Sequence, residues 1–181
     1  MVRPWVKKGV LIAIAAFIAA QLFPVSRDNP QVDPAKTIYS TYQMPAEVRA
    51  IFERSCRDCH SSLTTWPWYS HFAPVSWKVA DDVHQGRRHF SISDWGTYPA
   101  EKQNRKLGEI CEQIKTGEMP DQIYTWIHTQ AKLTQAERES LCRWTLAAQA
   151  SMNLGPPPAP IPTNSMQAAP PSSTQPAAGA R

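Results

Sequence analysis

Three features are missing from this 181-residue sequence, and each absence excludes a class of protein. No stretch alternates apolar and polar residues for long, as half-buried strands do, so the sequence predicts an all-α fold. The 19 lysines and arginines are scattered, without a basic stripe and interleaved aromatic residues, and this excludes nucleic acid as a partner. No internal repeat is present. A chain of this length then has room for one folded domain with tails.

The N-terminal segment has the charge pattern of an exported protein. Arg3, Lys7 and Lys8 precede an apolar run from Gly9 to Ala20. The run is slightly shorter than the roughly 20 residues that span a bilayer comfortably. No convincing small-x-small cleavage site follows it, so we expect residues 1–25 to be a retained single-pass anchor. The basic flank predicts a cytoplasmic N-terminus and a periplasmic domain. The alternative is a cleaved signal peptide, which leaves the protein exported and soluble.

The remaining boundaries follow from composition. Residues 26–43 are predicted to be a linker that leaves the membrane, and residues 44–153 a folded domain. Residues 154–181 are dominated by proline, alanine and serine and show no helical or alternating apolar pattern. Such a segment cannot bury enough apolar surface to offset its ordering entropy, so it is predicted to be a disordered tail.

Apolar spacing and capping signals predict four helices in the folded domain. The first begins at Pro45 and carries its apolar stripe up to a Cys-x-x-Cys-His motif, and the second covers about Val75 to His84 with Gly86 as its stop. The third covers about Ala100 to Thr116, with Gly117 in the left-handed stop position. The fourth begins at Thr134, whose spacing to Glu137 fits a capping box. The proline- and tryptophan-rich loops between them, residues 61–74, 89–99 and 118–133, are long enough to suggest that they cover a large rigid body.

The motif itself, Cys56-Arg57-Asp58-Cys59-His60, carries the chemistry. A structural zinc site needs four ligands, but no second Cys-x-x-Cys is present. A thioredoxin-like redox pair wants a strand before the motif, whereas a helix is predicted here. The motif therefore predicts one covalently attached haem c. Cys56 and Cys59 would form thioethers with the two vinyl groups, and His60 would bind the iron.

The far side of the iron requires a second ligand. Met119 lies in the loop sequence "GEMPDQ", before a proline that stiffens the chain, and we expect its sulfur to bind opposite His60. Methionine–histidine ligation raises the haem potential relative to two histidines and leaves no open position, which suits electron transfer. His128 is the competing candidate, His71, His84 and His89 are weaker ones, and an open or water-filled site is a further alternative.

Aromatic residues and two further cysteines complete the set of candidate site residues. Five aromatic side chains offer broad, rigid apolar surfaces that could wall in a porphyrin. They are Trp66, Trp68, Tyr69, Trp77 and Trp95. Cys111 and Cys142 lie on the apolar faces of the third and fourth predicted helices. Outside the cytoplasm they could form a disulfide, and two buried thiols are an equally good interpretation.

These motifs together resemble a known family. The run "CRDCHSSLTTWPWYSHFAPVSWKVADDVHQGRRHFSISDW", followed by "GEMP", "YTWIHTQAKLT" and "ERESLCRW", is similar to the bacterial haem-binding domain family. The resemblance covers roughly residues 26–146. It implies a small c-type cytochrome-like protein of the bacterial inner membrane, with haem on Cys56, Cys59 and His60 and with Met119 as sixth ligand. The tail and the Cys111/Cys142 pair are not part of it.

The resulting functional expectation is a monohaem c-type cytochrome. We expect an electron carrier rather than an enzyme, with one redox protein as donor and another as acceptor, neither identified by the sequence. One alternative is a haem-based gas or redox sensor, or an accessory haem subunit of a larger respiratory or photosynthetic complex. A small peroxidase would need a vacant site with an acid–base group above it.

Overall fold

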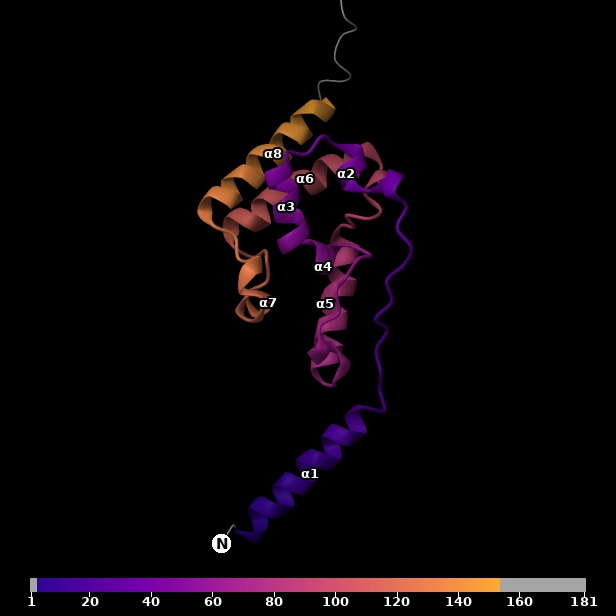
Figure 1. Ribbon diagram of the computed structural model, residues 1–181, viewed down its shortest axis with the longest axis vertical. Helices are drawn as coiled ribbons and strands as arrows, with labels where there is room; N and C mark the ends of the chain where they lie inside the picture. Colours follow the sequence, from indigo (N-terminus) through magenta and orange to yellow (C-terminus); the bar gives the residue numbers. More distant parts are fainter. Residues whose placement is uncertain (1–2, 154–181) are drawn as a thin grey trace, which may run out of the picture.

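The computed structural model describes residues 3–153, and all regular structure within them is helical (Figure 1). This confirms the predicted all-α class. The predicted C-terminal tail lies outside the described residues. The α-helices are α1 (Pro4–Ala20), α2 (Ile38–Thr41), α3 (Ala46–Ser55), α4 (Arg57–His60), α5 (Val75–His89), α6 (Ala100–Thr116), α7 (Gln122–Ile127) and α8 (Gln135–Asn153). Short 3-10 turns cover Pro34–Lys36, Trp68–His71, Trp95–Thr97 and Thr129–Ala131.

The hydrophobic core lies between α3, α6 and α8. Each helix turns one apolar stripe inward, and α6 packs along α8 while α3 packs against α8 (Figure 1). Trp144 of α8 is central, since its ring makes edge contacts with Phe52 at 5.6 Å and Tyr42 at 6.1 Å. Its indole N–H donates to the carbonyl of Gln43 at 3.1 Å. The large apolar residues of this core are Ile38, Val48, Ile51, Phe52, Ile92, Trp95, Leu107, Ile110, Ile114, Leu133, Leu141 and Trp144.

Local signals fix the ends of the two longest core helices where the sequence predicts them. Gly117 follows α6 with a φ of 78°, a left-handed conformation that glycine adopts without steric cost. At the start of α8, the Thr134 N–H donates to Glu137 Oε2 at 2.8 Å and the Glu137 N–H donates to Thr134 Oγ1 at 3.3 Å. These reciprocal bonds form the predicted capping box and satisfy two N–H groups that the helix leaves unpaired.

Helix α5 extends beyond its predicted end. The sequence predicts a stop at Gly86, but the helix continues to His89. Gly86 instead faces α4, where a Cβ atom added to it would lie 2.5 Å from the carbonyl oxygen of Cys59. The glycine is therefore a close-contact residue that lets α5 pack against the backbone of the Cys-x-x-Cys-His motif.

Two segments predicted as irregular contain helical structure. The loop over residues 118–133 includes α7, which begins where Asp121 Oδ1 accepts a hydrogen bond from the Tyr124 N–H at 2.9 Å. Within the predicted linker, residues 34–41 form a 3-10 turn and α2. Ile38 of this segment is fully buried, and its N–H donates to the Ile92 carbonyl at 2.9 Å. Part of this segment therefore belongs to the core.

Helix α1 lies apart from the other helices, and a long segment connects it to α2 (Figure 1). The first part of this segment, residues 21–29, is called here the exit strap. The Gln21 amide donates to the Ala73 carbonyl at 3.1 Å and accepts from the Ala73 N–H at 3.0 Å. The Trp77 indole donates to the Phe23 carbonyl at 2.9 Å. Among residues 3–153, no helix combines the length and the apolar character needed to cross a membrane. The anchor expected over residues 1–25 stays a prediction.

Candidate functional site

The Cys-x-x-Cys-His motif lies where α3 ends and α4 begins, beside two adjoining cavities. Cys56 lines the first cavity, of about 440 Å³, and Cys59 lines the second, of about 360 Å³. Both volumes are within the range of small-molecule and cofactor sites. Two of the predicted iron ligands, His60 and Met119, line both cavities. Because the two cavities share these wall residues, they are together called here the hollow. All four residues predicted to hold a haem line it.

His60 is buried and held in one orientation. Its Nδ1 lies 3.2 Å from the carbonyl oxygen of Phe90, and its ring stacks on the Phe90 ring with centroids 4.0 Å apart. Burial is the main reason why the pKa of His60 falls to about 4, although backbone hydrogen bonds oppose the shift. The imidazole is thus neutral at pH 7. With Nδ1–H donating to Phe90, the lone pair of Nε2 is available to a metal.

The two thiols of the motif are half-buried, and neither forms a disulfide. Burial raises the pKa of both Cys56 and Cys59 to about 12, so both remain protonated at neutral pH. A redox-active Cys-x-x-Cys pair depends on the opposite shift, a thiol whose pKa is lowered until it is a thiolate. The electrostatics of this motif therefore differ from those of a thioredoxin-like pair.

Met119 lies in a short loop that is fixed at both ends. Its N–H donates to the Gln113 carbonyl at 3.1 Å, just after the left-handed Gly117, and two residues later Asp121 caps α7. The Met119 side chain is 39% exposed in this structure, so it faces the hollow instead of packing in the core. A soft thioether donor is thereby held on the wall that also contains His60.

The other histidines differ in how they are placed. His128 lines only the second cavity, where its Nε2 lies 2.6 Å from the Tyr69 hydroxyl and its ring stacks on Tyr124. His89 lies at the end of α5 and lines both cavities, although its side chain is exposed. His71 and His84 line neither of the two cavities.

An apolar cofactor fits the remaining surface of the hollow. Ile123 and Ile127 of α7 line the second cavity and are 58% and 59% exposed, and Val75 beside them is also exposed. Covering exposed aliphatic side chains with an apolar surface is favourable in free energy, because it removes their surface from water. Covering this wall is the role that a porphyrin face would have, so the residues present fit a haem.

Most of the predicted aromatic wall lies elsewhere. Of the five candidates, Tyr69 alone lines one of the two cavities. Trp95 is in the core, with edge or tilted contacts to its aromatic neighbours, and Trp77 binds the exit strap. Trp68 is 76% exposed, and the partly buried Trp66 is also outside the cavity walls. The walls come instead largely from α5, α6 and α7.

The sequence reasoning missed these wall residues. Ile110 and Ile114 of α6 line the first cavity, and Ile123, Tyr124 and Ile127 of α7 line the second. The spacing of Ile123 and Ile127, four residues apart after the capping residue Asp121, is the signal that could have revealed α7.

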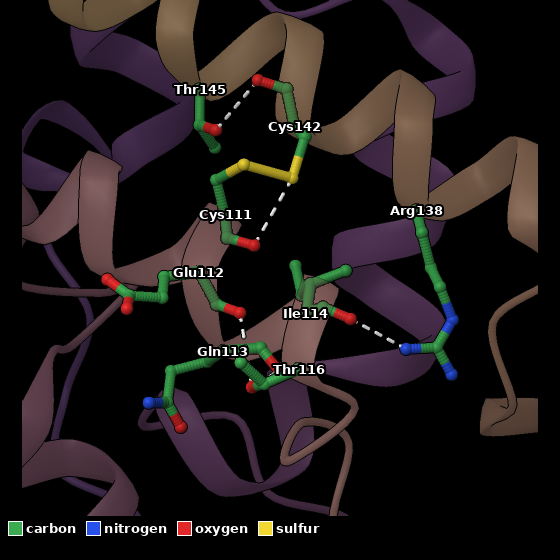
Figure 2. Close-up of a disulfide and its surroundings, with 8 residues drawn as sticks. All are labelled: Cys111, Glu112, Gln113, Ile114, Thr116, Arg138, Cys142 and Thr145. Carbon is green, nitrogen blue, oxygen red and sulfur yellow. Dashed lines mark hydrogen bonds between the residues drawn. A yellow bond between two sulfur atoms is a disulfide. The ribbon is translucent and has the colours of Figure 1, made fainter.

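A disulfide between Cys111 and Cys142 joins α6 to α8 (Figure 2). Near the end of α6, one turn after Cys111, the Ile114 carbonyl accepts a hydrogen bond from Arg138 of α8 at 2.7 Å (Figure 2). Because Ile110 and Ile114 flank these contacts and face the first cavity, the covalent bond and the hydrogen bond together hold one cavity wall in place.

An all-helical domain whose Cys-x-x-Cys-His motif and methionine loop meet at one hollow belongs to the class of haem-binding proteins. The comparison with known families agrees, because residues 15–147 match the model of the haem-binding domain. The chain belongs to the haem-binding domain family. No curated protein and no solved structure shows a significant match to it.

Proposed function

We propose that this chain is a monohaem c-type cytochrome that passes single electrons between redox proteins on the periplasmic side of the bacterial inner membrane. One observation carries the proposal: Cys56, Cys59, His60 and Met119 converge on a single hollow. The family match supports haem binding. Covalent attachment, the count of one haem, electron transfer and the membrane location are the proposed parts.

The two cysteines would attach the cofactor. Both thiols are protonated, and each can add its sulfur to one carbon of a vinyl group and its hydrogen to the other. This addition forms one C–S bond per cysteine and requires no oxidant. Gly86 keeps α5 tight against Cys59, so the attachment site has little freedom to move.

His60 and Met119 would hold the iron without leaving a place for substrate. The bound haem would supply an iron that changes between the ferric and ferrous states. His60 presents Nε2 in a fixed direction because Phe90 holds Nδ1 and stacks on the ring. Met119 presents its sulfur from a loop fixed by Gln113 and Asp121. Two preset ligands favour electron transfer because little has to rearrange.

Helix α1 supports the proposed membrane location. Its apolar side chains, among them Leu11, Ile14 and Ile18, are exposed along the helix, and Lys7 and Lys8 lie near its start. An exposed helix that is apolar on every side is suited to lipid, and the basic end favours a cytoplasmic N-terminus. The donor and acceptor would then approach the domain from the periplasm or within the membrane.

Absorption spectra of the purified holoprotein test the proposal. The ferric wild type should show a sulfur-to-iron charge-transfer band, and Met119→Ala should lose it. His128→Ala and His89→Ala are matched controls, because each removes another side chain from the cavity walls, and both should keep the band. The haem should remain on the polypeptide after extraction with acid acetone. An unchanged spectrum in Met119→Ala would remove Met119 from the iron, and a colourless extracted chain would end the proposal.

A second candidate, a haem-based sensor, is favoured by one observation, the partial exposure of Met119 on a loop. A sensor needs an exchangeable sixth ligand. Carbon monoxide added to the same reduced samples separates the two functions. The carrier should resist binding at neutral pH, while Met119→Ala should bind the gas readily. Rapid, complete binding by the wild type would favour the sensor.

A further inference from the structure

Lys106 of α6 is a buried lysine on the wall of the first cavity. The residue is only 9% exposed and precedes Leu107 and Ile110 on the inward side of the helix. Lysine is almost never buried to this extent unless its charge is paired. Its Nζ donates to Glu109 Oε2 at 2.5 Å. That carboxylate is itself half-buried and also accepts from Arg105 at 3.2 Å, so Lys106 shares its partner with a second cation.

The charges around the hollow make Lys106 distinctive. Among the described residues lining the first cavity, it is the one lysine or arginine. The second cavity also has one, Lys78, but this residue is exposed, ion-paired with Asp82, and accompanied there by Asp58 and Asp121. The first cavity also contains two carboxylates, Glu109 and Glu118, so each cavity has one cation among acidic side chains. Lys106 differs from Lys78 in being buried, so solvent screens its charge less and an anionic group would be attracted more strongly beside it.

We propose that the ammonium group of Lys106 pairs with one propionate carboxylate of the bound haem. This inference rests on the proposed function. A haem carries two vinyl groups on one edge and two propionates on the other. With the vinyl groups fixed at Cys56 and Cys59, a carboxylate that lies inside the hollow would need a cationic or hydrogen-bonding partner there. Lys106 opens onto the same cavity as Cys56, and Glu109 remains beside it as a second acceptor.

The pairing would position the cofactor and tune its reduction potential. A cation near the iron disfavours the ferric state, which carries one more positive charge than the ferrous state. Lys106 is buried, so solvent screens its charge weakly, whereas Arg105 is exposed and strongly screened. Removal of the Lys106 charge should therefore lower the potential, and removal of the Arg105 charge should leave it nearly unchanged.

The test compares Lys106→Met with Arg105→Met in the full-length holoprotein. The two variants remove the same charge from the same Glu109 partner, but only Lys106 lines the cavity. Lys106→Met should shift the ferric/ferrous equilibrium about tenfold towards ferric at a fixed applied potential. It should also shift the propionate bending mode in the resonance Raman spectrum. Arg105→Met should change neither, and Lys106→Arg should restore both.

Four outcomes overturn the inference. Wild-type values in Lys106→Met would show that Lys106 has no propionate partner, and equal shifts in Arg105→Met would show a general charge effect. If Lys106→Met folds poorly, Lys106→Gln replaces it, because it also removes the charge but keeps a polar side chain: a wild-type potential in this variant would rule out the pairing. A wild-type protein without any haem signal would overturn the proposed function as well, whereas a normal haem spectrum with no effect at Lys106 would overturn this inference alone.

Discussion

Phe90 orients the imidazole of His60 in two ways at once. Its carbonyl accepts from Nδ1, which fixes the tautomer, and its ring stacks on the imidazole at an interplanar angle of 14°. The His60 carbonyl in turn accepts from the Ile92 N–H at 2.7 Å. Backbone and side chain of the proposed ligand are therefore both held by the short segment that follows α5, and the ring needs no rearrangement to present Nε2.

Gly86 sets how closely α5 approaches the Cys-x-x-Cys-His motif. In Gly86→Ala, the new Cβ would meet the Cys59 carbonyl at 2.5 Å, and backbone atoms cannot move aside as a side chain can. We expect a loss of about 1–3 kcal/mol in the free energy of unfolding and a lower yield of covalently attached haem. Urea titrations followed by circular dichroism measure the first, and the haem absorbance per polypeptide measures the second.

Gly108→Ala is the matched control for this substitution. Gly108 also lies inside a helix, but a Cβ there would meet only the flexible end of Gln149 at 3.2 Å. Because alanine favours helix by about 1 kcal/mol over glycine, the variant should match or exceed the wild type in stability. Equal behaviour of the two variants would mean that the close contact at Gly86 has no energetic weight.

At the scale of elements, the disulfide between α6 and α8 closes a loop across a sequence separation of 31 residues. Because the cross-link restricts the unfolded chain, the double variant Cys111→Ala/Cys142→Ala should lose about 3–4 kcal/mol in the free energy of unfolding. Guanidinium titrations of the holoprotein provide the measurement. The haem spectrum without denaturant should stay unchanged, since neither cysteine lines a cavity and the bond from Arg138 to Ile114 still joins α8 to α6.

Wild-type protein treated with a reductant controls for the removed sulfur atoms. It keeps both side chains and loses only the bond, so its unfolding midpoint should approach that of the double variant. A double variant as stable as the wild type would show that the capping of α8 and the packing of α6 hold the pair without the cross-link.

The sequence correctly predicted the features that depend on residues close together in the chain. The left-handed Gly117, the Thr134 capping box and the Cys-x-x-Cys-His motif are local patterns, and each is found at its predicted position. Gly86 was misread as a helix stop because its role depends on Cys59, 27 positions away by residue number.

Tertiary contacts explain the other differences at the site. The tryptophans were predicted to surround the cofactor because of their size. Trp95 instead fills the core and Trp68 remains exposed, and no local sequence pattern distinguishes these two environments. The burial of Lys106 likewise follows from the way α6 turns toward the cavity, and a lysine in a helix of mixed polarity gives no sign of it.

At the scale of the whole molecule, Arg87 joins the exit strap to the loop that follows the Cys-x-x-Cys-His motif. Its guanidinium donates to the carbonyls of Ser61 and Asp28 at 2.8 and 2.9 Å, and to Asn29 Oδ1 at 2.8 Å. A fourth bond, at 2.9 Å, goes to the Thr64 hydroxyl. One side chain thus connects the strap, α5 and the loop that directly follows the Cys-x-x-Cys-His motif.

Arg87→Met should release the strap. Arg27 then loses the support of its neighbours and becomes a site for trypsin, so cleavage after Arg27 in the full-length holoprotein should be about tenfold faster than in the wild type. Mass spectrometry of the early fragments gives the rate. Arg88→Met removes the adjacent, exposed arginine and should cleave at the wild-type rate. Equal rates in all three proteins would show that the other contacts of the strap, made by Gln21, Phe23, Arg27 and Asn29, hold it without Arg87.

The exit strap also limits where electrons can be delivered. Gln21 is bonded to Ala73 directly after α1, and Phe23 to Trp77, so the chain has no slack between the end of that helix and the domain. Under the proposed topology the metal would sit at a constant height above the lipid and could not swing out to distant partners. The rate of electron transfer should then rise with the surface density of those partners, because they would have to reach the fixed domain by diffusion.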